Sequence, residues 1–335
     1  MPKLILVTGA TGNQGENWCL CGSVAKLLLQ YPEQYTVRCL TRNTESKAAR
    51  ELGDSGAELV RGNLTDLSTL PAAVIGCWGV FAVTNFYDAA IIDDPMSEEQ
   101  QGRNLAKAAH DAGTVECFIW STMPSSHALS GGKFFTRLYE GNAEVRLAPV
   151  QLFTDSGSSG KHLVDGYIRE LGLHGTFLYT GNFYENMVLR KHMSYDKETD
   201  TIIFKQPIIA PDAELTMLYV EKDLSAIVKA IFDQWEEKKA ELDGAYLQAS
   251  NARVRPKDIV AAAKKVSGKN VEYVVLPTTG VPERDTMFQF YNDVGMHPGV
   301  SLPDPQVVKL GVQLHDAEDY IREKLLPHLG LVPVN

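Results

Sequence analysis

Apolar runs and amphipathic stretches alternate through the first half of the chain. The apolar runs predict strands at residues 4–8, 35–42, 58–62, 78–84, 115–121 and 175–181. Charged stretches with apolar positions at helical spacing predict helices at 44–52, 66–74, 98–112 and 162–171. Strands that alternate with helices of about 10 to 15 residues are typical of a parallel sheet covered on both faces. We therefore expect an α/β fold with a doubly wound parallel sheet.

The pattern becomes less regular in the second half. Short strands are predicted at 202–205, 214–219, 245–249 and 271–276, and helices at 223–239, 256–266, 288–294 and 304–326. We expect residues 1–180 to form the α/β domain and residues 181–335 to form a smaller α+β substrate lobe, partly interleaved with it. The Ser- and Gly-rich stretch 125–160 is predicted to be a long loop over the carboxyl edge of the sheet.

Composition narrows the choice of partners. Of 335 residues, 44% are hydrophobic, and the net charge is −10, which argues against direct binding to nucleic acid. No apolar run approaches the roughly 20 residues that cross a bilayer, and Met1 leads directly into the first strand, so we expect neither a membrane span nor a signal peptide. The cysteines have no metal-ligand spacing, and no metal site is expected; they are Cys19, Cys21, Cys39, Cys77 and Cys117. A reducing, cytoplasmic location fits these features.

A glycine-rich turn follows the first predicted strand. Its glycines are spaced Gly-x-x-Gly-x-x-Gly and lead into a predicted helix. Such glycines let the backbone approach a pyrophosphate, while the helix N-terminus offers unpaired N–H groups. The alternative is a tight strand-to-helix turn without a ligand. We expect dinucleotide binding by Gly9, Thr11, Gly12, Asn13, Gln14 and Gly15.

Arg42, at the end of the second predicted strand, indicates which dinucleotide is bound. An Asp or Glu at this place binds the ribose 2′-hydroxyl of NAD, whereas an Arg suits the 2′-phosphate of NADP. No acid occupies positions 41–43, and Lys47 lies close enough to assist. We therefore expect NADP(H). The alternative is that Arg42 is a surface arginine.

Polar residues also follow the later strands, where ligands of open α/β sheets bind. Asn63 and Leu64 are expected beside the adenine, although a helix cap at Thr65 or Asp66 explains that segment equally well. The other candidates for cofactor contacts are Thr84, Asn85, Phe86 and Ser121.

These motifs, taken together, resemble the NmrA-like family of atypical short-chain dehydrogenase/reductases, whose relatives include isoflavone-reductase-like enzymes. The resemblance rests on Arg42 and on four segments: Val7-Thr8-Gly9-Ala10-Thr11-Gly12-Asn13-Gln14-Gly15, Phe118-Ile119-Trp120-Ser121-Thr122, Ser130-Gly131-Gly132-Lys133, and Tyr179-Thr180-Gly181-Asn182-Phe183-Tyr184-Glu185-Asn186-Met187. It implies an extended Rossmann fold and NADP(H). Family functions divide between redox-sensing regulators without chemistry and reductases of fungal or plant secondary metabolism.

The resemblance also assigns roles near the nicotinamide. It implies that Lys161 holds the nicotinamide ribose and assists proton transfer, and that Tyr179 and Phe183 line the pocket. Apolar packing is the alternative for Phe183. A surface position is the alternative for Lys161, although a helix N-terminus is electrostatically unfavourable for a cation.

One feature of active short-chain reductases is missing. The residue four before Lys161 is Gly157, so the Tyr-x-x-x-Lys pair is absent. Tyr139, His127, Tyr184 and water remain as proton donors. The leading hypothesis is an NADP(H)-dependent oxidoreductase that reduces a carbonyl, imine or enone. The alternative is a non-catalytic NADP(H) redox sensor and negative transcriptional regulator, cytoplasmic or nuclear, whose partner is a regulatory protein rather than a small substrate.

Two stretches depart from the family pattern. Residues 16–21 read as an insertion in the first helix, and residues 142–158 lengthen the loop before Lys161. Each is either a genuine elaboration or untranslated sequence retained in a gene model. If the insertion continues the helix, it buries a new stripe of Trp18, Cys21, Ala25, Leu28 and Leu29; otherwise it bulges out near the pyrophosphate. A weaker hypothesis is that the chain is a structural or scaffold protein that has lost cofactor binding through the insertion.

Overall fold

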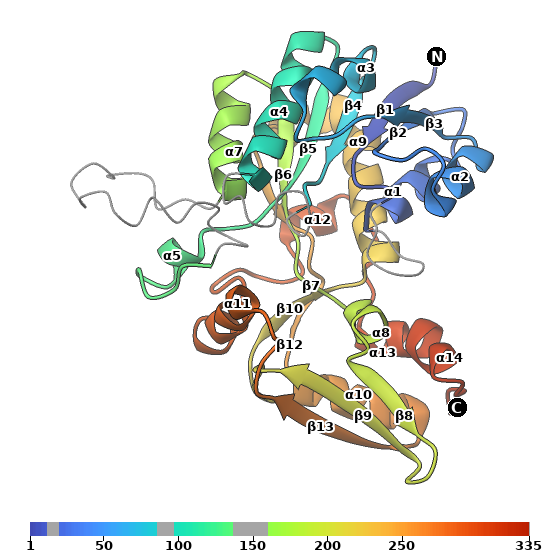
Figure 1. The fold of residues 1–335 in the computed structure, drawn as a ribbon, viewed down its shortest axis with the longest axis vertical. Coiled ribbons are helices and arrows are strands. Elements are labelled where there is room, and N and C mark those ends of the chain that lie inside the picture. Colours follow the sequence, from blue (N-terminus) through green and yellow to red (C-terminus); the bar gives the residue numbers. More distant parts are fainter. Residues whose placement is uncertain (12–19, 86–96, 137–159, 335) are drawn as a thin grey trace.

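The computed structural model describes residues 1–11, 20–85, 97–136 and 160–334. An α/β domain and a smaller lobe lie one above the other, with the segment that contains β7 passing between them (Figure 1). Within the described residues, no helix is both long and apolar enough to cross a membrane.

A seven-stranded parallel sheet forms the α/β domain. Its strand order is β3-β2-β1-β4-β5-β6-β11, so the order reverses between β1 and β4. This confirms the predicted doubly wound parallel sheet, and such a reversal is where open α/β sheets bind ligands. The strands are β1 (Lys3–Val7), β2 (Tyr35–Thr41), β3 (Glu58–Arg61), β4 (Gly79–Ala82), β5 (Cys117–Thr122), β6 (Gly175–Tyr179) and β11 (Tyr246–Gln248).

Both faces of the sheet are buried, which explains why its strands read as continuous apolar runs. Along β1, Ile5 and Val7 join one core cluster, whereas Leu6 joins the cluster on the opposite face. The first face is covered by α1 (Leu20–Leu28), α2 (Lys47–Asp54), α9 (Ser225–Leu242) and α12 (Pro305–Lys309). The second is covered by α3 (Pro71–Val74), α4 (Ser97–Ala112) and α7 (Gly160–Glu170).

The first helix begins at Leu20, inside the stretch that reads as an insertion. Ala25 and Leu28 of the expected stripe are fully buried, and Leu29 packs against the same core. Trp18 and the side chain of Cys21 lie outside the described residues. Among the side chains of this helix that the structure describes, Val24, Ala25 and Leu28 pack into the core.

The smaller lobe combines short strands and helices around a second core. Its sheets have the orders β12-β10-β7 and β13-β9-β8. The strands are β7 (Asn182–Phe183), β8 (Met193–Asp196), β9 (Thr201–Pro207), β10 (Leu215–Leu218), β12 (Ala252–Val254) and β13 (Asn270–Leu276). The helices are α8 (Asn186–Leu189), α10 (Pro256–Ser267), α11 (Pro282–Asp293), α13 (Ala317–Tyr320) and α14 (Leu326–His328).

Several predicted elements differ from the structure; the helix expected over 288–294, for example, extends over Pro282–Asp293 as α11. The helix expected over 304–326 is interrupted, because Gly311 adopts a φ of 76° and Asp316 caps a new helix through the Asp319 N–H. The stretch 125–160 is not loop throughout, since a short helix, α5 (Ser126–Leu129), forms where Ser125 Oγ accepts the Ala128 N–H at 3.1 Å.

Candidate functional site

A cleft of about 730 Å³ lies at the carboxyl ends of the parallel strands and extends between the α/β domain and the smaller lobe. This volume lies within the range of small-molecule sites. Sequence-predicted residues line one half, which we call the cofactor half: Gly9, Thr11, Arg42, Asn63, Leu64, Thr84, Asn85, Ser121 and Lys161. The smaller lobe lines the other half, which we call the substrate half.

The strand reversal shapes the centre of the cofactor half. Gly9 has a φ of 69°, which only glycine adopts without strain. Thr8 ties β1 to the end of β4, since its Oγ1 donates to the Val83 carbonyl at 2.9 Å and accepts the Val83 N–H at 2.8 Å. Thr11 Oγ1 donates to Thr41 Oγ1 at 2.7 Å, which fixes the turn against β2.

Arg42 follows β2 directly and is exposed at the edge of the cleft. Lys47, in contrast, is absent from the described lining residues. Its side chain is 86% exposed, and its Nζ lies 3.9 Å from Glu51 Oε1 on the same helix. The structure thus brings Arg42, but not Lys47, to the place expected for a 2′-phosphate.

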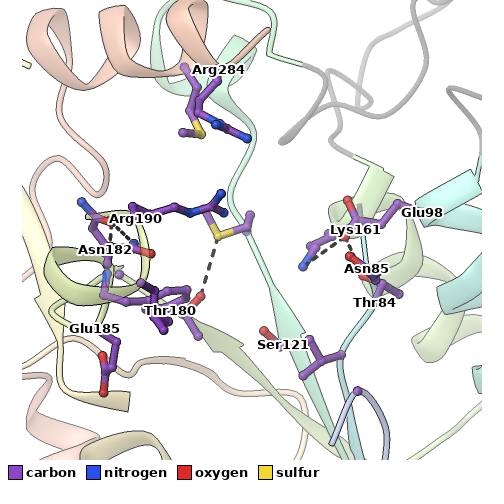
Figure 2. Close-up of a pocket in the computed structure, with 18 of the residues that line it drawn as sticks. Thr84, Asn85, Glu98, Ser121, Lys161, Thr180, Asn182, Glu185, Arg190 and Arg284 are labelled. Atoms are coloured by element: carbon purple, nitrogen blue, oxygen red, sulfur yellow. Dashed lines mark hydrogen bonds and ion pairs between the residues drawn. The ribbon is translucent and has the colours of Figure 1, made fainter. Parts of the chain in front are cut away.

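Lys161 lies at the other end of the cofactor half, in the first turn of α7 (Figure 2). Its Nζ is 3.4 Å from Glu98 Oε1, and both side chains are largely buried, with 13% and 8% exposed. Thr84 Oγ1 donates to the same Glu98 oxygen at 2.7 Å. Lys161, Glu98 and Thr84 therefore form a connected polar group, and sequence reasoning missed the carboxylate at its centre.

The helix that carries Lys161 is anchored by a buried carboxylate. Asp165, one turn later, accepts from Thr122 Oγ1 at 2.8 Å and from the Tyr246 hydroxyl at 3.0 Å. The Trp120 indole also donates to the Lys161 carbonyl at 3.4 Å. These contacts tie α7 to β5 and β11, so the position of Lys161 follows from the sheet.

Other predicted site residues have different places. Tyr179 is absent from the described lining residues; its ring stacks on Tyr246, with centroids 5.1 Å apart. Phe183 does line the cleft. Gly12, Asn13, Gln14, Gly15 and Phe86 lie outside the described residues.

The substrate half contains residues that sequence reasoning missed. One face of α11 supplies Arg284, Met287, Phe288 and Tyr291. Their spacing of three and four is the available signal, but it is also typical of a core-facing helix. The segment after β6 and strand β9 supply further polar residues: Asn182, Glu185, Asn186, Arg190, Lys191, His192 and Lys205.

Glu185 stands at the boundary of the two halves. Its Oε1 accepts the Glu221 N–H at 3.0 Å, and Oε2 has no partner among the described residues. Burial raises the pKa of this carboxyl to about 7. In Figure 2 the Glu185 carboxylate points away from Arg190. The contact that the structure shows for Glu185 is therefore structural, because its carboxylate accepts a hydrogen bond from the backbone that leads into α9.

Comparison of the sequence with known families agrees with this geometry. A sequence model of the NmrA-like family matches residues 1–149 and 157–301. The chain belongs to the NmrA-like family.

Individual relatives differ in how much of the chain they share. The NmrA-like oxidoreductase ptmS of Penicillium ochrochloron is 28% identical over 352 residues, which cover 98% of this chain and 96% of that protein. The NmrA-like oxidoreductase hkm9 of Aspergillus hancockii is 41% identical over 138 residues, but these cover only 41% of this chain and 39% of hkm9. The structure of NmrA, a negative transcriptional regulator, in complex with NADP has a TM-score of 0.68 at 21% identity and covers 96% of this chain and 95% of that chain. At this identity the likeness shows the fold.

The proton donors suggested for this NmrA-like chain lie in separate places. His127 is exposed on α5, and Tyr184 is fully buried, with no partner for its hydroxyl among the described residues. Neither is found in the described lining, and Tyr139 and Gly157 lie outside the described residues. Hydroxyl groups that do line the cleft belong to Thr11, Thr41, Ser46, Thr84, Ser121, Thr180, Thr279 and Tyr291.

Proposed function

We propose that this NmrA-like chain is an NADP(H)-dependent oxidoreductase that reduces a carbonyl, imine or enone, as implied for relatives in fungal-type secondary metabolism. The observation that carries the proposal is the cleft itself. Gly9, Arg42 and Lys161 line one continuous cavity at the strand-order reversal, and the cavity continues past Lys161 into a second half lined by the smaller lobe. A reductase needs a second half of this kind, because its substrate must lie beside the nicotinamide.

The residues of the cofactor half fit NADP(H). Gly9 presents backbone without a side chain to the cleft. Arg42 offers a fork of N–H donors suited to a phosphate, and no acid replaces it at positions 41–43. The solved NmrA complex with NADP supports the same assignment.

Lys161 has the central part in the proposed reaction. When bound, NADPH supplies a hydride from C4 of its nicotinamide. Lys161 Nζ would donate to the ribose hydroxyls, and its pairing with Glu98 at 3.4 Å holds the amine at the cleft. Thr84 keeps Glu98 in place through the 2.7 Å hydrogen bond. Ser121, which is buried beside the cleft near the end of β5, would border the reacting group.

Calorimetric titration of NADPH and NADH tests the cofactor assignment. We expect Arg42→Glu to weaken NADPH binding by about 10- to 100-fold, because a charge-assisted hydrogen bond is lost and an acid faces the phosphate. NADH binding should change much less. The matched control is Arg61→Glu, since Arg61 is exposed at the end of the adjacent strand and is absent from the described lining. Equal losses for both dinucleotides would refute the 2′-phosphate assignment.

The second candidate function is an NADP(H) redox sensor that acts through a regulatory protein. It is favoured by the missing Tyr-x-x-x-Lys pair and by the fold shared with NmrA. NADPH oxidation measured against a panel of carbonyl, imine and enone compounds separates the two. Binding of NADPH without turnover of any of these classes would favour the sensor.

A further inference from the structure

A buried ion pair lies at the end of the cofactor half that adjoins the substrate half. Along the carboxyl edge of the sheet, Arg42 follows β2, Gly9 follows β1 and Thr84 follows β4, and these strands lie in that order. A dinucleotide with its 2′-phosphate at Arg42 and its pyrophosphate beside Gly9 would have its nicotinamide near Lys161 and Glu98. The nicotinamide ring carries a positive charge in NADP⁺ and no charge in NADPH. The ion pair therefore lies at the part of the cofactor whose charge changes in the reaction.

Close packing of α4 against α7 builds this ion pair. A Cβ added at Gly102 of α4 would lie 2.7 Å from Val164 Cγ2 of α7 and 2.9 Å from Trp120 Cη2 of β5. The missing side chain lets the two helices come this near. Glu98 lies about one turn before Gly102, and Lys161 lies about one turn before Val164. The close approach therefore brings the first turns of the two helices together at the cleft.

The two charges have opposite relations to their own helices. Glu98 lies in the first turn of α4, where the positive end of the helix dipole favours a carboxylate. Lys161 lies in the first turn of α7, where the dipole disfavours a cation, and its side chain is only 13% exposed. A largely buried cation in such a place needs a counter-charge. Glu98 Oε1 supplies it at 3.4 Å, and the Thr84 hydroxyl donates to the same oxygen at 2.7 Å (Figure 2).

A neighbouring ion pair shows that burial alone does not explain the position of Glu98. Glu99, on the same turn of α4, pairs with Arg103 at 2.6 Å, and the two side chains are 6% and 33% exposed. Neither residue is found among the described lining residues of the cleft, whereas Glu98 and Lys161 both are. The first turn of α4 therefore presents one buried carboxylate to the cleft and another to its own helix.

We propose that Glu98 is the positioning residue of Lys161 and that the two charges together set how strongly the cleft prefers NADP⁺ to NADPH. A carboxylate attracts the positive nicotinamide ring and an ammonium repels it, and such interactions are stronger in a partly buried site than in water. While the pair is intact, the two interactions oppose each other. Removal of one charge leaves the other to act on the ring. The proposal rests on the binding and orientation of NADP(H) proposed above.

Calorimetric titration with NADP⁺ and with NADPH gives the ratio of the two affinities, which is the quantity that tests the proposal. Glu98→Gln removes the negative charge but keeps an oxygen that can accept the Thr84 hydrogen bond. It should lower the affinity for NADP⁺ relative to NADPH by about tenfold, as expected for a unit charge in a partly buried site. Lys161→Gln should raise the same ratio by about tenfold. A purely structural role would weaken both dinucleotides alike, and shifts of the same sign in the two variants, or no shift, would overturn the proposal.

Two further variants separate the effect of charge from an effect on folding. Glu99→Gln breaks the neighbouring buried pair by the same change of side chain, and it should leave the affinity ratio as in the wild type. The double variant Glu98→Gln/Lys161→Gln leaves neither charge unpaired, so it should fold even if a single variant does not. Its ratio should return close to the wild-type value, because the two opposing charges are removed together. A shifted ratio in Glu99→Gln, or a double variant as far from the wild type as Glu98→Gln alone, would overturn the proposal.

The same titrations distinguish failure of this proposal from failure of the proposed function. A wild-type chain that binds neither dinucleotide would overturn both. Binding of both dinucleotides with a ratio that the charge substitutions do not move would overturn only the role of the ion pair. Opposite shifts in a chain that turns over no carbonyl, imine or enone would support the ion pair and favour the redox sensor.

Discussion

The two halves of the cleft are built in different ways. The cofactor half consists of residues at or beside the ends of parallel strands, such as Gly9 after β1, Arg42 after β2 and Ser121 within β5. The substrate half consists of a turn after α8, strand β9 and one face of α11, which lie far apart in the sequence. Topology alone brings strand ends to one edge, whereas long-range packing of the smaller lobe decides which residues face the substrate.

Lys161→Ala should produce the largest effect, because Lys161 lies where the halves meet. We expect turnover to fall by about 10²- to 10⁴-fold, as for the loss of a group that assists proton transfer. NADPH affinity should fall far less, since most of the cofactor half is untouched. Steady-state kinetics and calorimetry measure the two quantities, and Lys107→Ala on the exposed face of α4 is the control. A parallel loss of affinity and turnover would mean that Lys161 only binds the cofactor.

Gly181→Ala tests the connection between the halves. A Cβ at this position would lie 2.5 Å from the Thr216 carbonyl oxygen and 2.3 Å from Ser250 Oγ, so backbone must move. We expect the free energy of unfolding to fall by about 3 kcal/mol, as for an overpacked core. Gly166→Ala is the control, because a Cβ there meets nothing within 4 Å and helix propensity should add about 0.5–1 kcal/mol. Chemical denaturation checks both values; tolerance of Gly181→Ala would show that the lobes are joined loosely.

Glu185 gives a smaller, pH-dependent effect at the boundary. Burial raises its pKa from 4.5 in a freely exposed state to about 7 in the folded chain, so the folded state holds the proton more tightly. The contribution of Glu185 to the free energy of unfolding is therefore present at low pH and is lost as the pH rises toward 7. Between pH 5 and pH 7 the free energy of unfolding of the wild-type chain should fall by about 2 kcal/mol relative to that of Glu185→Gln. Denaturation at both pH values measures the difference, and a constant difference would mean that Glu185 is solvated.

The sequence predicted the fold and most of the cofactor half for a physical reason. The strands of a sheet that is buried on both faces read as long, regular apolar runs, and these predict the fold. The carboxyl ends of parallel strands share one edge of the sheet, and this places Gly9, Arg42 and Thr84 together. The Glu98 partner of Lys161 was not predicted, because a helix carboxylate has no periodic signal. Strands as short as β7 and β12 exist only through tertiary pairing, so the substrate half that depends on them could not be predicted either.

Hydrogen–deuterium exchange of the whole chain with and without saturating NADPH tests the division of the cleft most directly. If the cleft is divided into a cofactor half and a substrate half as described, NADPH should slow exchange in the cofactor half, at residues 9–11, 42–46 and 84–85. Exchange in the substrate half, at residues 190–192 and 284–291, should change little. Protection concentrated in the second set of segments, or protection in neither set, would contradict it.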